Sequence, residues 1–486
     1  MGITIVGLGS GNGQLLTREA WEVLVSAENL YLRTQDHPAV VDLPPTLTWH
    51  SFDHVYQANN DFAAVYTHIV DAIIRLGQAG DVCYAVPGHP FLGEATVQGI
   101  LRQAETLGLS VRIVAGLSFI EPVLAAVGAD GLDGLQLYDA IDLAQREHPV
   151  LLPDVPLLLG QVYSRWLAGD LKLTLMKAYP DEHPVKLVHE AGTAAQRVEP
   201  LPLYAIDRSP HIRNLTALYV PPLPLVSSLP GFAETVAILR SPQGCPWDRE
   251  QTPQTLRADF LEEMAEVLDA LDRGDMPALR EELGDLLLHV VMQAQIATET
   301  GEFTLTDVIT GIDAKIKRRH PHVWGDVVVE NTTQLLANWE AIKAQEKAEQ
   351  PASLLNNIPP ALPSLARAQK IQKRVARVGF DWTEVEGVWL KLQEEIEELR
   401  AAETEEEKSA ELGDSLFALV NLARWLNLDA ETSLREANNR FTRRFQQMER
   451  LAIQRGLSID QMPQHALESL WQEVKHNYLL DEDSSA

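Results

Sequence analysis

A proline-rich stretch near the middle of the chain separates two kinds of sequence that do not belong to one continuous fold. Residues 219–231 read YVPPLPLVSSLPG. Proline fixes φ and has no amide hydrogen, so several prolines this close together prevent both a long helix and a central strand. Before the stretch, short β-branched segments alternate with helical ones, and after it long segments with helical periodicity follow one another. We therefore predict a multidomain protein in which 219–231 links an α/β half to an all-α half.

The N-terminal half, residues 1–222, is predicted to be a two-lobed α/β domain. Thr17 is a suitable N-cap for a helix over Thr17–Ala27, and the break between the lobes is expected near Leu109–Gly116. Short runs punctuated by Gly or Pro predict strands, and their alternation with helical stretches is typical of α/β folds. The predicted strands are Ile3–Leu8, Asp81–Val86, Ser110–Val114, Pro149–Leu152 and Val185–His189.

The C-terminal half is predicted to be all-α, because its long segments of helical period are joined by short Gly and Pro turns. A second proline-rich patch, Pro351–Pro363, divides this half, so we expect helical domains over residues 223–350 and 364–486. The predicted helices are Leu256–Arg273, Pro277–Glu299, Leu305–Arg319, Trp389–Ala401, Glu405–Leu426 and Leu434–Arg455.

The two helical segments repeat one pattern. LEEMAE at Leu261–Glu266 is followed by EELGDLL at Glu281–Leu287, and QEEIEEL at Gln393–Leu399 is followed by AELGDSL at Ala410–Leu416. Small differences in the spacing of matching blocks are what loop variation produces. We interpret the C-terminal half as a tandem duplication.

Acidic residues recur in these blocks at helical spacing, beside apolar stripes. Glu263 and Glu266 are three residues apart, as are Glu282 and Asp285, so each pair shares one face of its helix. Two such helices joined by a short turn would pack antiparallel and bring their carboxylates together. The second repeat supplies the matching set Glu395, Glu398, Glu411 and Asp414.

Carboxylates that converge in this way need a counter-ion. Two like charges about 4 Å apart repel by roughly 4 kcal/mol at an effective dielectric constant near 20. Hard oxygen ligands in this number suit Mg²⁺ or Mn²⁺, which also share phosphate oxygens. We therefore predict a divalent-metal site in each repeat, and the alternative is a solvated acidic face.

Basic residues follow each acidic pair. A third helix that folds back could place them opposite the carboxylates, and metal ions facing Arg or Lys form a phosphate-binding arrangement. The alternative is that they form salt bridges with the abundant glutamates. These residues are Lys315, Arg318 and Arg319 in the first repeat and Arg440, Arg443 and Arg444 in the second.

The composition limits the partners and the compartment. The 40 Lys and Arg residues against 69 Asp and Glu residues leave a net charge of −29, which argues against polymeric nucleic acid but not against nucleotides whose phosphates a metal ion holds. Only Cys83 and Cys245 are present, so we expect no disulfide framework and a cytoplasmic protein. No apolar run is long enough to predict a membrane span. No GxxxxGK[ST] motif occurs, which does not support a Walker-type ATPase.

The acidic blocks and basic tracts of the two repeats resemble those of the MazG-type nucleoside triphosphate pyrophosphohydrolases. The resemblance covers nearly all of residues 232–475, including both repeats. It implies an all-α dimeric unit and Mg²⁺-dependent hydrolysis of nucleoside triphosphates to the monophosphate and pyrophosphate. Besides the acidic blocks, it rests on GCPWD at Gly244–Asp248, RRHPHVW at Arg318–Trp324, NNRFTRRF at Asn438–Phe445 and LWQEVK at Leu470–Lys475.

The resemblance also implies roles for particular residues. The eight carboxylates named above match the metal ligands. Arg440, Arg444, Trp471 and Lys475 match positions that contact nucleotide, which favours the second repeat as the main site. Lys315 and Arg319 are the phosphate-binding candidates of the first repeat. A carboxylate outside the ligand set, with Glu394 and Glu262 as candidates, would activate the attacking water.

The N-terminal half contains four motif blocks: GLGSGNGQLLT at Gly7–Thr17, VPGHPFLGE at Val86–Glu94, AGLSFIEPVLAAVG at Ala115–Gly128 and LVHEAGT at Leu187–Thr193. In this order they resemble those of the tetrapyrrole (corrin/porphyrin) methylases, a two-lobed α/β family that binds S-adenosylmethionine in its cleft. Ser10 and Asn12 stand where the family pattern has Pro and Asp. The cofactor-binding residues that it implies are Gly7, Gly9, Gly11, Gly88 and Ser118.

Three hypotheses about function follow. The main one is a Mg²⁺-dependent nucleoside triphosphate pyrophosphohydrolase that forms a homodimer through its helical half. The second is an S-adenosylmethionine-dependent methyltransferase whose helical half is a regulatory or dimerising module. The third is a nucleotide sensor that binds without turnover.

Overall fold

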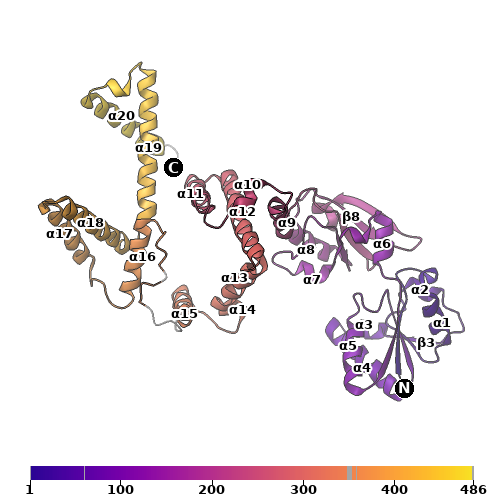
Figure 1. The fold of residues 1–486 in the computed structure, drawn as a ribbon. Coiled ribbons are helices and arrows are strands. Elements are labelled where there is room, and N and C mark those ends of the chain that lie inside the picture. The colour runs from indigo at the N-terminus through magenta and orange to yellow at the C-terminus, as the bar shows by residue number, and fades with distance from the viewer. Residues whose placement is uncertain (1, 60, 347–352, 357, 484–486) are drawn as a thin grey trace. The chain divides into compact units, whose positions relative to one another are not determined.

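The computed structural model describes residues 2–59, 61–346, 353–356 and 358–483. The chain forms two compact units, Met1–Asp313 and Ala314–Ala486. The first unit contains the α/β half and the first helices of the all-α half, and the second unit contains the remaining helices (Figure 1). The predicted domain boundaries around residues 222, 350 and 364 stay predictions.

The first lobe is a parallel sheet in the order β3-β2-β4-β1-β5, with helices on both faces (Figure 1). Its central strand β4 is buried along its whole length, as expected of a parallel strand covered on both sides. Ile5 and Tyr84 pack with Ile73 on one face. The elements are β1 (Gly2–Gly7), α1 (Arg18–Ser26), β2 (Leu30–Leu32), α2 (Pro38–Val41), β3 (Trp49–Ser51), α3 (Asp53–Ala58), α4 (Phe62–Ala79), β4 (Val82–Val86), α5 (Ala95–Leu107) and β5 (Ser110–Val114).

The second lobe is a mixed sheet in the order β6-β7-β10-β8-β9. β6 and β7 are parallel, and the other neighbours are antiparallel. Leu157, Leu187 and Leu218, from three adjacent strands, are fully buried in one core. The elements are α6 (Ile120–Val127), β6 (Gln136–Asp139), α7 (Ala140–Ala144), β7 (Leu157–Gly160), α8 (Arg165–Leu175), β8 (Pro184–His189), β9 (Arg197–Pro202) and β10 (Thr216–Val220).

Four predicted strands are confirmed with small changes at their ends, as is the helix capped by Thr17. The strand predicted at Pro149–Leu152 is wrong, and β7 at Leu157–Gly160 is the strand of this region. Prolines flank Pro149–Leu152 closely and remove amide donors that a ladder would need. The backbone of Leu152 instead bonds to the side chain of Gln136.

The connection between the two halves is shorter than the predicted 219–231. Tyr219 still pairs within β10, and the helix α9 (Leu229–Arg240) begins with Pro230 in its first turn, where the missing amide hydrogen has no helical partner anyway. Ser228 caps α9, and its hydroxyl donates to Asp154 Oδ2 at 2.8 Å. This bond anchors the start of α9 to the α/β half.

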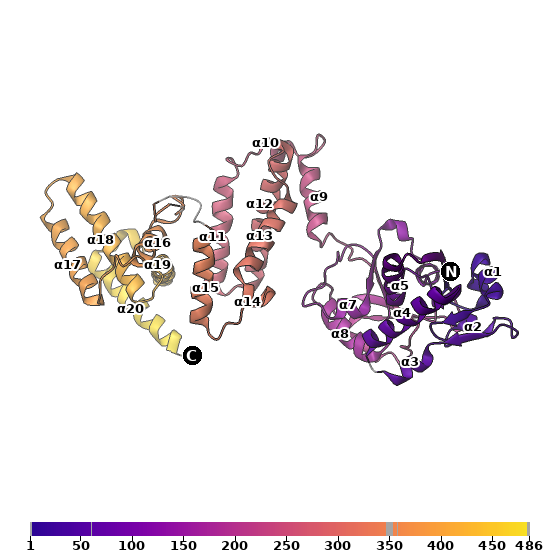
Figure 2. The ribbon, with the colours of Figure 1, turned by 90° about the horizontal axis from the view of Figure 1, so that it is seen from below.

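The C-terminal half is helical, as predicted, and the six predicted helices are present with ends shifted by a few residues. The pairs α11–α12 and α17–α18 are the two repeated helical hairpins (Figure 2). The helices are α10 (Pro246–Glu250), α11 (Arg257–Arg273), α12 (Met276–Thr300), α13 (Leu305–Arg319), α14 (Pro321–Trp324), α15 (Thr332–Gln345), α16 (Ser364–Ala376), α17 (Val385–Ala401), α18 (Glu405–Trp425), α19 (Ala430–Gln454) and α20 (Gln464–Asp483). In the predicted linker Pro351–Pro363, residues 351, 352 and 357 lie outside the described residues.

One ion pair holds α9 against the first hairpin. The Arg240 guanidinium donates to both carboxylate oxygens of Glu299 at 2.8 and 2.7 Å, and it also bonds to the backbone carbonyl of Gln251. The hydrogen bonds from Arg240 lower the pKa of Glu299. A carboxyl whose pKa is lowered by folding stabilises the folded state above its unfolded pKa and loses that contribution as the pH falls.

We predict that Glu299→Gln weakens the packing of α9 on α12 by about 1 kcal/mol, a value discounted because the Glu299 side chain is about one-third exposed. The full difference in packing free energy between the variant and the wild type should be present above about pH 4.3, the unfolded pKa of Glu. The difference should decrease as the pH falls below that value. Hydrogen exchange of the α9 amides measures the effect. Glu302→Gln, in the turn after α12, is the control, and equal exchange in both variants would contradict the prediction.

Candidate functional site

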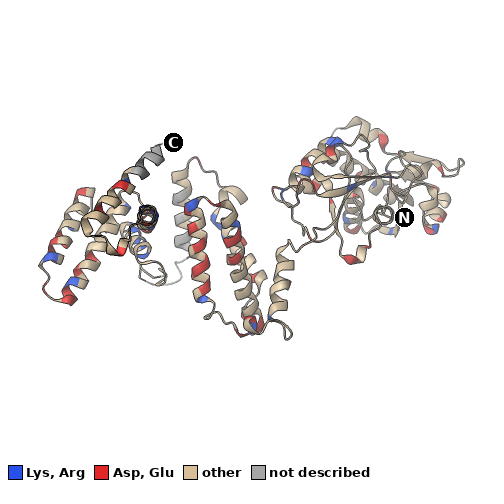
Figure 3. Ribbon diagram, turned by 90° about the horizontal axis from the view of Figure 1, so that it is seen from above, with Lys and Arg blue, Asp and Glu red and all other residues tan. Residues whose placement is uncertain are grey.

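The first hairpin brings together three of its four predicted metal ligands. Gly274, with a φ of +66°, ends α11, and the side chain of Asp275 caps α12, so the two helices are joined by a tight turn. Carboxylate oxygens of Glu263, Glu266 and Glu282 lie within 4.8 Å of one another. Acidic residues line both helices of this hairpin (Figure 3).

The remaining acids of this hairpin lie close by. Asp285 is outside the group of three but acts electrostatically on Glu263 and Glu282. Glu262, the predicted general base of the first repeat, is exposed beside them. Partial burial, then the negative charges of Asp285 and Glu266, raise the pKa of Glu263. The cluster therefore contains mutually repelling charges that a cation would stabilise.

The second hairpin repeats the arrangement. Oxygens of Glu395, Glu411 and Asp414 lie within 4.8 Å of one another, while Glu398 lies outside this group and acts on Glu411 electrostatically. Partial burial, followed by the charges of Glu398, Glu395 and Asp414, raises the pKa of Glu411. Glu395 is 7% exposed, so it is the most deeply placed of the three.

A residue that sequence reasoning missed lies in this second cluster. Lys391 Nζ lies 2.7 Å from Glu395 and 2.9 Å from Glu394, the predicted general base of the second repeat. These bonds, the one to Glu395 first, raise the pKa of Lys391. Its spacing, three and four residues before two glutamates on one helix, was the available signal.

Both clusters fit a hard divalent cation. Each offers at least three carboxylate oxygens from two helices, without the sulfur or imidazole ligands that softer metals favour. Partial burial, followed by the charges of neighbouring carboxylates, raises the pKa of Glu263, Glu282 and Glu411. Mg²⁺ or Mn²⁺ held here would keep open positions for phosphate oxygens.

The basic tract of the first repeat is engaged elsewhere. Arg318 and Arg319 form ion pairs with Glu346 at 2.7 and 2.6 Å, and these bonds, that from Arg319 first, lower the pKa of Glu346 to about 2. Lys315 is exposed on the same helix, α13. The salt-bridge alternative thus describes Arg318 and Arg319 in this structure, and their predicted role in phosphate binding stays a prediction.

The predicted nucleotide-binding residues of the second repeat lie on α19 and α20. The ring of Trp471 packs against Phe441, with 5.1 Å between ring centroids, so Trp471 contacts α19, the helix that also carries Arg440. Trp471 also borders the buried cluster formed by Met448 and Val474. Arg440 is exposed, while Arg444 and Lys475 are partly buried. Figure 1 shows α19 extending away from the α17–α18 hairpin, with α20 beside its far part.

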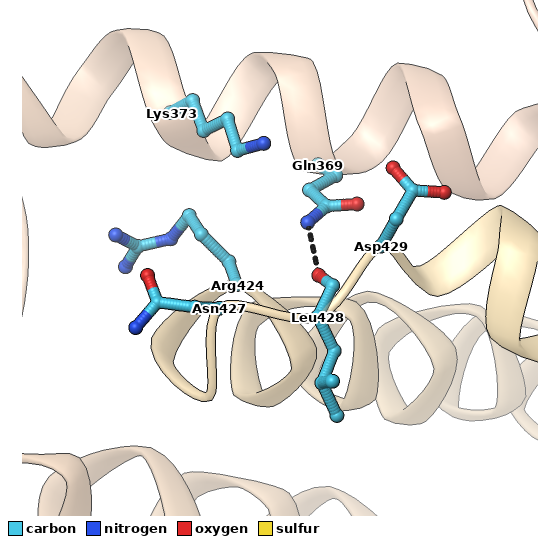
Figure 4. Close-up of a pocket in the computed structure, with 6 residues that line it drawn as sticks. All are labelled: Gln369, Lys373, Arg424, Asn427, Leu428 and Asp429. Carbon is cyan, nitrogen blue, oxygen red and sulfur yellow. Dashed lines mark hydrogen bonds between the residues drawn. The ribbon is translucent and has the colours of Figure 1, made fainter.

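A polar elbow connects the helix that carries Glu411 and Asp414 to the helix that carries Arg440. In the turn between α18 and α19, the side-chain amide of Gln369 donates to the Leu428 carbonyl at 2.7 Å, and its oxygen accepts from Ala430 (Figure 4). Lys373, Arg424, Asn427 and Asp429 line a pocket of about 200 Å³ here. Arg424 is paired with Asp381 at 2.6 Å, so the elbow is cross-linked to the start of α17.

The glycines of the α/β half mostly serve close packing of its loops. A Cβ on Gly7 would lie 2.5 Å from the Gly88 carbonyl oxygen, and one on Gly11 equally close to the carbonyl of Gly192. Gly9 and Gly88 exchange backbone hydrogen bonds at 3.2 and 2.8 Å. Of the predicted cofactor-binding glycines, Gly88 faces space free of other described atoms within 4 Å of a Cβ, and its φ is +64°.

Two further residues of this region have local partners. The Ser118 hydroxyl accepts from the Ile120 amide and bonds to the Glu121 side chain, so its partners lie in the first turn of α6. The Ser10 hydroxyl, by contrast, is buried in the glycine loop and has no partner among the described residues. Cofactor contacts of Ser118 and the four glycines stay predictions.

Comparison with known families assigns both halves of the chain. Residues 2–207 match the tetrapyrrole (corrin/porphyrin) methylases, and residues 251–324 match the MazG nucleotide pyrophosphohydrolase domain. The second match contains the whole first carboxylate cluster. Within the described ranges, no helix is long and apolar enough to cross a bilayer.

Similar proteins extend over the whole chain or over its C-terminal half. YabN, an uncharacterized protein of Bacillus subtilis (strain 168), is 40% identical over 482 residues, which is 97% of this chain and 98% of YabN. The nucleoside triphosphate pyrophosphohydrolase/pyrophosphatase MazG of Thermotoga maritima is 44% identical over 247 residues, 50% of this chain and 95% of that protein. The nucleoside triphosphate pyrophosphohydrolase of Escherichia coli (strain K12) is 49% identical over 244 residues, 49% of this chain and 93% of that protein.

Solved structures are similar to the N-terminal half. Uroporphyrin-III-C-methyltransferase from Thermus thermophilus is 20% identical with a TM-score of 0.36, over 46% of this chain and 94% of that chain. The same enzyme with S-adenyl homocysteine is 19% identical with a TM-score of 0.35, over 46% and 97%. These scores are too low to carry an argument, and the fold class rests on the two sheets and the family matches.

The predicted resemblances are therefore confirmed for both halves. The identity to YabN covers nearly all of both chains, and the proteins similar to the C-terminal half are named for pyrophosphohydrolase activity. The chain belongs to the same family as YabN, and in it an N-terminal tetrapyrrole methylase domain precedes a C-terminal MazG pyrophosphohydrolase region.

Proposed function

We propose that the helical half hydrolyses nucleoside triphosphates to the monophosphate and pyrophosphate with Mg²⁺ or Mn²⁺. The convergence of Glu395, Glu411 and Asp414 within 4.8 Å is the observation that carries this proposal. The MazG relatives, 44% and 49% identical over this half, support it. The second repeat is proposed as the main site, because Arg440 and the Trp471 segment follow it.

Each acidic side chain has a proposed task. Glu395, Glu398, Glu411 and Asp414 hold the divalent ion, which when bound neutralises the triphosphate and polarises its α-phosphoryl group. Glu394 accepts the proton of the attacking water, and Lys391, whose Nζ lies 2.9 Å from Glu394, orients the Glu394 carboxylate. Glu263, Glu266, Glu282 and Asp285, with Glu262 as the base, are the corresponding residues of the first repeat.

The basic and aromatic residues recognise the nucleotide in this proposal. Arg440, Arg444 and Lys475 bind the phosphates, and Trp471 stacks on the base. In the first repeat, Lys315 and Arg319 would take the phosphate-binding part. Arg319 would then exchange its partner Glu346 for a phosphate.

Exposed apolar surfaces of the hairpins support the proposal of a homodimer. Apolar side chains remain exposed in rows beside the carboxylates, at i, i+4 and i+7 spacing on α12 and similarly on α18. A second copy presents the same row and would bury it, as the isologous contact of a two-fold dimer does. The rows contain Leu283, Leu287 and Val290 on α12 and Leu412, Leu416 and Leu419 on α18.

The first prediction concerns the metal ligands of the second repeat. Glu411→Gln combined with Asp414→Asn should lower the kcat/KM for Mg²⁺-dependent pyrophosphate release by about 100-fold or more, because two oxygen ligands lose their charge. The measurement is chromatographic product analysis with each common triphosphate, with and without Mg²⁺.

The matched control changes two acids of the same helix outside the cluster. Glu405→Gln with Glu406→Gln, in the first turn of α18, removes the same charge and should leave turnover unchanged. Glu266→Gln with Glu282→Gln reports the share of the first repeat. Undiminished turnover after loss of both clusters would exclude this mechanism, and binding without any monophosphate would instead indicate the nucleotide-sensor alternative.

A second prediction tests the dimer. Leu287→Glu and Val290→Glu, together with Leu416→Glu and Leu419→Glu, place charges in the proposed contact and should shift the mass in light scattering from dimer to monomer. Leu107→Glu, at an equally exposed leucine on α5, is the control. A dimer that survives the fourfold variant would place the contact elsewhere.

A methylase cofactor is the second candidate function. The family match over residues 2–207, together with the open space beside Gly88 and the unpartnered hydroxyl of Ser10, supports binding of S-adenosylmethionine near Gly88. We predict that calorimetric titration gives saturable heat with S-adenosylmethionine and that S-adenosylhomocysteine competes. The absence of heat up to millimolar cofactor would count against a methyltransferase.

A further inference from the structure

The two carboxylate clusters differ by one charge at equivalent places. Lys391 lies four residues before Glu395 on α17, and the residue four places before Glu263 on α11 is Asp259. Side chains at i and i+4 share a helix face, so Lys391 is on the face of α17 that carries Glu395, and Asp259 is on the face of α11 that carries Glu263. The second repeat therefore has a cation where the first has another carboxylate.

Lys391 is part of the second cluster in this structure. Its Nζ lies 2.7 Å from Glu395 and 2.9 Å from Glu394, and it also acts electrostatically on Glu411. Glu395 is the innermost carboxylate of that cluster. The Lys391 ammonium group thus supplies part of the positive charge that the converging carboxylates require.

The first cluster has different surroundings. The charged groups that act most strongly on Glu263 and Glu282 are all carboxylates. Arg273, at the end of the same helix, is paired with Asp269 at 3.2 Å. An ion from solution is therefore the natural source of positive charge for this cluster.

We propose that Lys391 is a built-in counter-cation that competes with the divalent ion, so that without nucleotide the second cluster binds Mg²⁺ more weakly than the first. An ion that enters the second cluster must displace Lys391 from Glu395, whereas one that enters the first only relieves repulsion. This inference rests on the proposed function, since it takes both clusters as metal sites. The two repeats then fill at different concentrations of free divalent ion.

Mn²⁺ binding to the full chain without nucleotide tests the inference. Electron paramagnetic resonance of free Mn²⁺ should reveal two classes of site. The weaker class should vanish in Glu411→Gln with Asp414→Asn, and the tighter class in Glu266→Gln with Glu282→Gln. Lys391→Met should strengthen the weaker class by about threefold to fivefold, the effect of one partly exposed ion pair. Asp259→Lys should weaken the tighter class by a similar factor.

Two controls show whether the effect depends on a positive charge at position 391 and not on the net charge of the chain. Lys370→Met, exposed on α16, removes the same net charge and should change neither class. Lys391→Arg keeps the charge and should keep the weaker class weak. If Lys391→Met does not fold, Asp259→Lys alone decides.

Other outcomes distinguish this inference from the proposed function. Two classes of equal affinity, or a weaker class that Lys391→Met leaves unchanged, would overturn the inference and leave the metal sites in place. Loss of the tighter class in the Glu411 and Asp414 variant would overturn it too, because the order of affinity would be reversed. A chain that binds no Mn²⁺ at either cluster would overturn both.

Discussion

Repulsion between carboxylates held on facing helices is the constraint on which the helical half depends. Each hairpin joins its helices by a short connection and packs them closely, so the acids on their shared edge cannot separate without loss of packing. The negative charge must then be balanced by protonation, by an internal cation or by an ion from solution. In both repeats, partial burial and then neighbouring carboxylates raise the pKa of one member of the cluster, Glu263 in the first and Glu411 in the second.

Both repeats contain converging carboxylates, but the groups that balance their negative charge differ. In the second repeat Lys391 balances part of the charge, whereas the charged groups around Glu263 in the first repeat are carboxylates. The basic tracts have diverged as well. Arg318 and Arg319 pair with Glu346, whereas Arg440 is exposed on α19. Two hairpins with the same motif can thus differ in charge balance, which is a physical basis for unequal roles.

In the α/β half, close packing between loops is the main constraint. Gly7 and Gly11 are needed there because neighbouring carbonyl groups leave no room for a Cβ. A glycine motif therefore reports loop packing at least as much as ligand contact. Gly88 and the unpartnered hydroxyl of Ser10 are the features of these loops that loop packing alone does not explain.

The sequence by itself determined the two fold classes, the duplicated hairpins and most of the helices, because helical period and Gly or Pro punctuation are local properties. The strand that it predicted at Pro149–Leu152 is wrong, because the strand of this region, β7, is set by pairing with β6 and with the distant β10. Only the tertiary structure decided that Glu263, Glu266 and Glu282 converge while Asp285 lies just outside, and that Lys391 pairs with Glu395. Helical spacing gives the face on which a side chain lies, but packing between helices sets the distances, and those distances decide which charges share one ion.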